Sequence, residues 1–251
     1  QFILPRLTER KKARRSSKNH RISPYLLLLS GPQGSGKSTL VRELRADLKT
    51  RGLGVAVMSL DDLYLTHEEQ KELTSKTTNP LWRGRGLPGT HDMELGRRTL
   101  QALMDGSTVR LPRFDKAAYN GQGDRSAEGV LVGQCPVDVV LFEGWCLGYE
   151  SMQDSELKAA WDRESQSLPA SLQGEVKLDD VREVNEQLRN GIEPWWEMAD
   201  GVVEIRSRDI ETIYRWREGA EADLRTVSGH GLSIEEVRRM VDRFAVIYQL
   251  W

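Results

Sequence analysis

Short apolar runs alternate with longer amphipathic stretches along most of the chain. Four runs are short and continuous enough to predict buried strands: Tyr25–Ser30, Val55–Leu60, Val137–Phe142 and Gly201–Ile205. The segment after the first run has apolar residues three or four positions apart, at Leu40, Val41, Leu44 and Leu48, and predicts a helix. Strands that alternate with helices pair in parallel through right-handed crossovers. The pattern therefore predicts a three-layer α/β fold with a parallel sheet of about five strands and helices on both faces.

The last third of the chain is predicted to be mainly helical. A capping box at Ser233–Glu236 precedes a stripe with helical spacing at Val237, Val241, Phe244, Tyr248 and Trp251. A similar stripe runs over residues 178–188. We interpret both stripes as core-facing rather than functional. Residues 77–92 are rich in Gly and Pro and predict an ordered loop.

Charge and composition exclude several classes of protein. Lys and Arg number 36 against 38 Asp and Glu, so a globally basic nucleic-acid-binding protein is excluded. No apolar run approaches the roughly 20 residues of a membrane helix. The two cysteines form neither a disulfide framework nor a zinc-binding pattern, which favours a reducing, cytoplasmic compartment. Neither nucleic acid nor membrane is an expected partner.

Residues 1–24 form a basic arm, with eight basic residues and one acid before Pro24. We interpret it as a solvated helix or leader whose apolar residues Phe2, Ile3, Leu4 and Leu7 dock on the core, in preference to a targeting or nucleic-acid-binding segment. Because the chain begins with Gln rather than Met, a trimmed N-terminus is indicated and organellar targeting stays open.

A glycine-rich turn directly follows the first predicted strand. Residues Gly31–Ser38 match G-x-x-x-x-G-K-[ST], and a predicted helix begins right after them, which is the context of a phosphate-binding P-loop. Glycines let backbone N–H groups face phosphate oxygens, and the helix N-terminus adds its positive dipole end. Lys37 then reaches the terminal phosphates, and Ser38 is a ligand of Mg²⁺. The predicted nucleotide-binding residues are Gly31, Gln33, Gly34, Ser35, Gly36, Lys37, Ser38 and Thr39.

A second glycine pattern, Gly84–Gly89, fits the G-x-G-x-x-G of dinucleotide-binding proteins. Trp82 and Arg83 precede it in place of a strand, and Pro88 lacks a backbone N–H, so we do not interpret it as a nucleotide site. The N-K-x-D tetrapeptide with which a GTPase would read its base is absent from the sequence.

The acids at the ends of the predicted strands indicate a small-molecule kinase. Such an enzyme needs a carboxylate that orients and deprotonates the accepting hydroxyl, an acid for Mg²⁺, and arginines that cover the transferred charge. Asp61 is the predicted base and Glu143 the predicted metal-side acid, while Arg215 and Arg217 are predicted to close over the phosphates. The alternatives are a capping or turn role for Asp61 or Asp62, and surface ion pairs for the two arginines.

The segment between the second and third strands has a local positive excess, with eight basic residues and five acids between Asn79 and Arg125. This excess suggests an anionic acceptor. Asp92 could instead cap the following helix, and aromatic residues at Trp82, Phe114 and Tyr119 leave a nucleoside slot open. The predicted acceptor-binding residues are Arg83, Arg85, His91, Asp92, Arg113, Asp115, Lys116 and Arg125.

Together these motifs resemble the plant and fungal type of D-glycerate 3-kinases, in the uridine kinase, phosphoribulokinase and pantothenate kinase group. The likeness runs from Ser30 onward, and the segments that carry it are SGPQGSGKST (30–39), SLDDLYLT (59–66), NPLWRGRGLPGTHD (79–92), LPRFDKAAYNGQGDR (111–125), LFEGWCLG (141–148), VNEQL (184–188) and YRWR (214–217).

The resemblance implies ATP-dependent phosphorylation of D-glycerate to 3-phosphoglycerate, with Asp61 as the catalytic aspartate. It also implies one P-loop kinase domain over residues 25–251, an acceptor-site insertion over about 63–130 and a helical lid over about 206–228. Residues 150–176 follow the family pattern only loosely, and the last helix ends earlier than expected. The alternatives are a sister kinase acting on a nucleoside or pantothenate, or a protein that uses ATP only as a switch.

Overall fold

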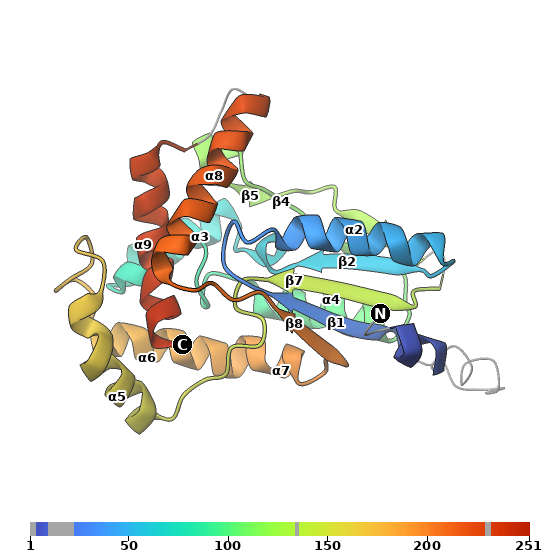
Figure 1. Cartoon of the computed structure of the whole chain (residues 1–251), viewed down its shortest axis with the longest axis horizontal. Helices are drawn as coiled ribbons and strands as arrows, with labels where there is room; N and C mark the ends of the chain where they lie inside the picture. Colours follow the sequence, from blue (N-terminus) through green and yellow to red (C-terminus); the bar gives the residue numbers. More distant parts are fainter. Residues whose placement is uncertain (1–3, 10–22, 134–135, 229–231) are drawn as a thin grey trace.

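The computed structural model describes residues 4–9, 23–133, 136–228 and 232–251. Its centre is a four-stranded parallel sheet in the order β2-β7-β1-β8 (Figure 1). The strands are β1 (Tyr25–Ser30), β2 (Val55–Ser59), β7 (Val139–Gly144) and β8 (Gly201–Glu204). The predicted α/β fold is therefore confirmed. The sheet has four strands rather than about five, because the other strands in the described residues are shorter and pair antiparallel outside it.

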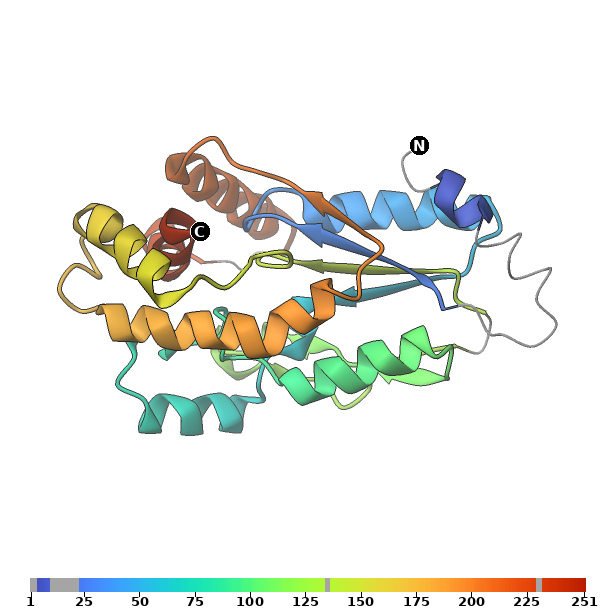
Figure 2. The ribbon, with the colours of Figure 1, turned by 90° about the horizontal axis from the view of Figure 1, so that it is seen from below.

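Side chains of the central strand alternate between the two faces of the sheet, as strand geometry requires. Leu27 belongs to a hydrophobic cluster with α2 (Lys37–Thr50). Leu28 belongs to a second cluster, which includes residues of α4 (Met93–Met104) and α6 (Leu178–Gln187). Figure 2 shows α2 on one side of the sheet and α4 and α6 on the other. Both faces of β1 are buried, and this explains why its sequence is a continuous apolar run.

A long insertion connects β2 to β7. It begins with a 3₁₀ turn, η1 (Leu60–Leu63), at the carboxyl end of β2. Two small antiparallel ladders, β3 with β6 and β4 with β5, follow α4. The further elements are α3 (His67–Lys76), η2 (Pro80–Trp82), β3 (Val109–Leu111), β4 (Phe114–Asp115), η3 (Tyr119–Gly121), β5 (Asp124–Arg125) and β6 (Val130–Val132). The Gly84–Gly89 pattern follows η2 rather than a strand and has no helix or strand of its own, in agreement with the predicted loop.

The rest of the chain is mainly helical. Its elements are α5 (Asp154–Glu164), η4 (Ser165–Ser167), η5 (Leu188–Ile192), α7 (Glu193–Trp196), α8 (Ile210–Ser228) and α9 (Ile234–Leu250). α8 and α9 pack side by side (Figure 1). The predicted core stripe of α9 is confirmed, since Val237, Val241 and Phe244 are at most 3% exposed. In the stripe at 178–188, Val181 and Val184 are likewise buried.

Only part of the basic arm lies in the described residues. Residues 4–9 are helical, and Leu7 is buried in the cluster that contains Leu27, with Leu4 packed against it. The predicted docking of Leu4 and Leu7 is therefore confirmed, while Phe2, Ile3 and most of the basic residues lie outside the described part of the chain. Over the described residues, no helix combines the length and the apolar character needed to cross a bilayer.

Candidate active site

The P-loop connects β1 to α2 at the carboxyl edge of the sheet. Gly34 and Gly36 have φ values of 76° and 86°, in the left-handed region that favours glycine. Gly36 is the N-cap of α2 and offers no side-chain cap, so the first backbone N–H groups of this helix are open to an anion. The Ser35 hydroxyl is buried, and no hydrogen-bond partner for it is found among the described residues. Open N–H groups and an orphaned hydroxyl fit the oxygens of a bound triphosphate.

Lys37 lies at the start of α2 and is buried. Its ammonium group donates to the Pro32 carbonyl at 2.9 Å. Burial lowers the pKa of Lys37, and the nearby Glu143 and Asp61 carboxylates act in the opposite direction. The P-loop lysine is therefore within electrostatic reach of both predicted acids.

The two predicted acids come from the carboxyl ends of neighbouring strands. Glu143 is at the end of β7, where its carboxylate accepts a hydrogen bond of 2.8 Å from Ser59 of β2. Burial raises the pKa of Glu143, and the charge of Asp61 raises it further. Ser38 and Glu143 offer oxygen ligands of the kind Mg²⁺ takes together with water and phosphate oxygens. A cluster of three or more His, Cys, Asp or Glu residues suited to a metal is not found within the described residues.

Asp61 is the first acid of η1 and has two side-chain donors. Tyr64 donates to one oxygen at 2.8 Å, and Lys116 donates to the other. Burial raises the pKa of Asp61, but Lys116 and Tyr64 together outweigh it and hold the pKa at about 2. The carboxylate is thus fully ionised, and each oxygen keeps a free lone pair for a further donor.

Asp62 has a different environment from its neighbour. One of its oxygens accepts from Arg113, and the other accepts from the backbone N–H of Phe114 at 3.0 Å. The side chain is 12% exposed. Asp62 therefore ties η1 to the β4 segment.

A cavity of about 930 Å³ connects these groups. It extends from the P-loop past Asp61 and Glu143 to the Gly84–Arg85 turn, and α3, α8 and α9 contribute to its wall. Of the predicted nucleotide-binding residues, Gln33, Gly34, Lys37 and Ser38 line it. Gly31 is buried beneath the turn, and Thr39 is exposed on α2.

Of the eight predicted acceptor residues, Arg83, Arg85 and Lys116 line the cavity. Arg83 pairs with Glu175 at 2.7 Å. Arg85 donates to the carbonyls of Gly121 and Gln122.

The other five lie behind the wall or beside it. Asp92 caps α4 by accepting from the Leu95 N–H at 2.9 Å, as the alternative interpretation proposes, and it also pairs with Arg125 at 3.2 Å. Arg113 is paired with Asp62. Asp115 is exposed at the end of β4 and accepts from the backbone N–H of Ala117 at 2.9 Å.

His91 is buried against the ring of Tyr64, with 4.7 Å between the ring centroids. Neither of its ring nitrogens has a hydrogen-bond partner in the described residues. Burial lowers the pKa of His91 to about 4, although Asp61 acts in the opposite direction. The ring is therefore neutral near pH 7 and supports Tyr64 by packing.

The two predicted lid arginines differ. Arg217 of α8 lines the cavity and pairs with Glu221 one turn further along the helix. Its Nε is buried and has no hydrogen-bond partner in the part of the chain that the structure describes. Arg215 is exposed and donates to Thr212 at 3.1 Å. α8 also lies directly against the P-loop, because a Cβ on Gly34 would be 2.6 Å from the Trp216 carbonyl.

Several residues of the site were missed in the sequence. Tyr64 donates to Asp61, and two side chains of α9 reach the P-loop and the Gly84–Arg85 turn. Tyr248 donates to Gln33 of the P-loop, and Arg243 donates to the carbonyls of Gly84 at 2.8 Å and Arg85 at 3.3 Å. Helical spacing identified α9 as core-facing, but spacing does not show which of its residues border a cavity.

Known proteins of similar sequence include kinases, in agreement with the P-loop geometry of the site. The Zeta toxin family pattern matches residues 9–83, less than half of the chain. An uncharacterized kinase of Schizosaccharomyces pombe is 37% identical over 230 residues, 90% of this chain and 80% of the relative. The chloroplastic D-glycerate 3-kinase of Arabidopsis thaliana is 36% identical over 236 residues, 92% of this chain, and the chain spans 48% of that relative's length.

The comparison with solved structures also finds a kinase. The D-glycerate 3-kinase of Cryptococcus neoformans superposes with a TM-score of 0.87 at 32% identity, covering 99% of this chain and 85% of that one. These relatives are kinases, and their similarity extends over the P-loop, the insertion and the C-terminal helices. The chain belongs to the D-glycerate 3-kinase family of P-loop kinases and is an ATP-dependent kinase.

Proposed function

We propose that the protein transfers the γ-phosphoryl group of ATP to a hydroxyl of D-glycerate, giving 3-phosphoglycerate and ADP. The observation that carries this proposal is the continuous cavity, which is lined by the P-loop Lys37, by the ionised Asp61, and by Arg85 and Arg243, which have no ion pair within the described residues. The names of the Arabidopsis and Cryptococcus relatives support D-glycerate as the acceptor.

The P-loop binds the nucleotide. Backbone N–H groups over residues 31–39 hold the phosphates, and Lys37 stabilises negative charge on the group in transfer. Ser38 and Glu143 hold Mg²⁺, which screens the phosphate charge when bound. Glu143 is oriented for this by Ser59.

Asp61 receives the acceptor hydroxyl. As the hydroxyl oxygen bonds to the γ-phosphorus, the bond from phosphorus to the bridging oxygen of ADP breaks, and the hydroxyl proton passes to the carboxylate. Tyr64 and Lys116 fix the orientation of that carboxylate. The low pKa of Asp61 means that its main role before the transition state is to align the hydroxyl.

The remaining domain organisation follows from this assignment. Residues 25–251 form one kinase domain, the insertion over about 63–130 supplies the acceptor wall, and the segment over about 206–228 acts as a lid. Arg217 is the residue of that lid that reaches the phosphates, since it lines the cavity and Arg215 is exposed.

The test is an ADP-release assay with MgATP and a panel of acceptors: D-glycerate, L-glycerate, uridine, ribulose 5-phosphate and pantothenate. We expect fast release with D-glycerate alone, and we expect Asp61→Asn to abolish most of it while ATP affinity is kept. Asp105→Asn is the matched control, because Asp105 is an exposed carboxylate at the end of α4. Preference for uridine or pantothenate would move the protein to a sister kinase, and release that is independent of acceptor would indicate a switch.

A further inference from the structure

Five of the cations that line the cavity or lie behind its wall have a carboxylate partner. Lys116 pairs with Asp61, and Arg217 pairs with Glu221. The remaining pairs are Arg83 with Glu175, Arg113 with Asp62, and Arg125 with Asp92. The opposite charges of each pair largely cancel in their effect on a bound ligand. These residues therefore do not supply the positive charge that an anionic acceptor needs.

Arg85 and Arg243 differ from this group. Both line the cavity, and within the described residues neither forms an ion pair. Their hydrogen-bond partners are backbone carbonyls: Gly121 and Gln122 for Arg85, and Gly84 and the carbonyl of Arg85 itself for Arg243. A carbonyl satisfies an N–H group without cancelling the charge. Each guanidinium also has five N–H donors, so several stay available to a ligand.

These two charges are partly desolvated and act on each other. Burial lowers the pKa of Arg243, and the charge of Arg85 lowers it further. Burial also lowers the pKa of Arg85; Tyr64 and the Asp61 carboxylate act in the opposite direction, and the charge of Arg217 adds to the lowering. Arginine stays protonated under all ordinary conditions, so the protein carries two like charges in a semi-enclosed site, and within the described residues neither has a carboxylate in direct contact. An anion bound between them would relieve this cost.

The position of the pair matches the chemistry of the proposed acceptor. Arg85 and Arg243 line the same cavity as Asp61 and Tyr64, and the Tyr64 hydroxyl donates to Asp61 at 2.8 Å. The arginines therefore border the same space as the group proposed to align the acceptor hydroxyl. In glycerate the carboxyl carbon and the carbon that bears the terminal hydroxyl are only two bonds apart, so one small molecule can reach both.

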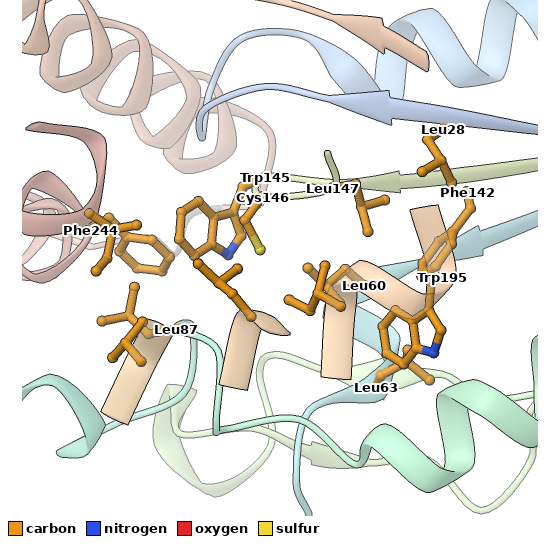
Figure 3. Packing of buried hydrophobic residues seen from close by; sticks show 14 of the residues in the cluster. Leu28, Leu60, Leu63, Leu87, Phe142, Trp145, Cys146, Leu147, Trp195 and Phe244 are labelled. Carbon is orange, nitrogen blue, oxygen red and sulfur yellow. The ribbon is translucent and has the colours of Figure 1, made fainter. Parts of the chain in front are cut away.

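Packing fixes the loop that carries Arg85 and the helix that carries Arg243. The Gly86 carbonyl accepts from Trp145 at 2.9 Å, and its N–H donates to Thr90 at 2.9 Å. Phe244 packs so closely that a Cβ on Gly86 would be 2.3 Å from its ring. Figure 3 shows Phe244 and Trp145 beside Leu87 in this core. A rigid base under both arginines is what a binding site for a small anion requires.

We propose that Arg243, together with Arg85, binds the carboxylate of the acceptor and sets the preference of the enzyme for a hydroxy acid over a neutral alcohol. This inference rests on the proposed function, because it takes D-glycerate as the acceptor. The helix α9 thereby contributes a specificity residue from outside the insertion that forms the rest of the acceptor wall.

The test compares D-glycerate with D-glyceramide, a neutral analogue of nearly the same shape, on the parent, Arg243→Gln, Arg85→Gln and Arg239→Gln. Arg239 is the matched control, since it is an exposed arginine on the same helix. We expect each of the first two variants to lose roughly 10- to 100-fold in kcat/KM for D-glycerate, the factor for removing a hydrogen bond to a charged group. We expect their kcat/KM for glyceramide and their KM for ATP to stay within about threefold of the parent.

Each outcome decides a specific point. If Arg243→Gln loses the same factor on both acceptors, Arg243 only supports the loop, and the inference is wrong. It is also wrong if the parent does not discriminate between the two acceptors. If Arg243→Gln is misfolded and so does not bind ATP, Arg85→Gln still tests the positive charge of the pair, because Arg85 lies on a different segment of the chain. A parent that turns over no D-glycerate overturns the proposed function, and the inference with it, whereas an active parent with unchanged variants overturns the inference alone.

Discussion

The contact between the P-loop and α8 can be tested with a matched pair of glycines. Gly34 and Gly36 both have left-handed φ values, 76° and 86°. A Cβ on Gly34 would lie 2.6 Å from the backbone carbonyl of Trp216 and 2.8 Å from the N–H of Arg217, whereas a Cβ on Gly36 would have no neighbour within 4 Å. Gly34→Ala and Gly36→Ala therefore share the backbone strain and differ in the overlap with α8.

The magnitudes follow from this difference. Left-handed strain costs about 1–2 kcal/mol for a residue with a Cβ, and the stiffer unfolded chain returns about 0.4–1 kcal/mol. Both apply equally to the two variants. Overlap with fixed backbone adds about 1–3 kcal/mol in packed surroundings, and only Gly34→Ala incurs it. For a chain of this size, each kcal/mol lowers Tm by about 2–4 °C, so we expect Gly34→Ala to melt roughly 2–12 °C below Gly36→Ala.

The assay is thermal unfolding in the absence of nucleotide, followed by circular dichroism, with urea unfolding as a second measure. Omitting ATP matters, because both substitutions alter the phosphate cradle and would change stabilisation by ligand. Equal melting temperatures for the two variants would refute the reasoning, since they would mean that α8 does not rest on the P-loop in solution. The proposed lid would then lack its contact with Gly34.

Three further predictions concern the chemistry. Lys37→Ala should lower turnover by several orders of magnitude with the circular dichroism spectrum unchanged, because it removes charge stabilisation in the transition state; near-normal turnover would contradict the P-loop assignment. Arg217→Lys should reduce kcat at least about tenfold, since a point charge does not reproduce the guanidinium fork, while Arg215→Lys should match the parent. In Lys116→Met, we expect the acid limb of the pH profile of kcat/KM to lie at higher pH than in the parent. Without Lys116, burial raises the pKa of Asp61, and protonation of Asp61 removes the base as pH falls. An unchanged pH profile would show that Lys116 does not hold that pKa down.

The sheet and the P-loop could be predicted because their signals are local. The run at residues 25–30 is apolar throughout, since both faces of β1 are covered, and the P-loop pattern spans eight consecutive residues. Asp61 and Glu143 could be predicted from the strand pattern, because they stand at the ends of predicted strands and parallel strands end at a common edge. A fifth strand had no corresponding apolar run, and the chain continues from β8 into helices instead.

The proposed acceptor wall could not be predicted in the same way, because it depends on contacts between distant segments. Arg113 meets Asp62 across 51 positions, and Arg243 meets Gly84 across 159. Helical spacing places Phe244 in the core and says nothing of the residue before it. Tyr64 was overlooked because an aromatic residue beside the predicted catalytic base has the same appearance in sequence as one that only fills the core.

A count of charges along a segment also differs from the field inside a cavity. The excess of basic residues between Asn79 and Arg125 is real, but the field at a ligand depends on which charges lie within a few ångströms of each other. Folding pairs Arg113 and Arg125 with carboxylates and brings in Arg243 from the C-terminal helix. An anion that binds beside Arg243 replaces no existing ion pair, whereas one that binds Arg113 must break one. Charge pairing, rather than charge number, therefore decides which residues are free to hold the acceptor.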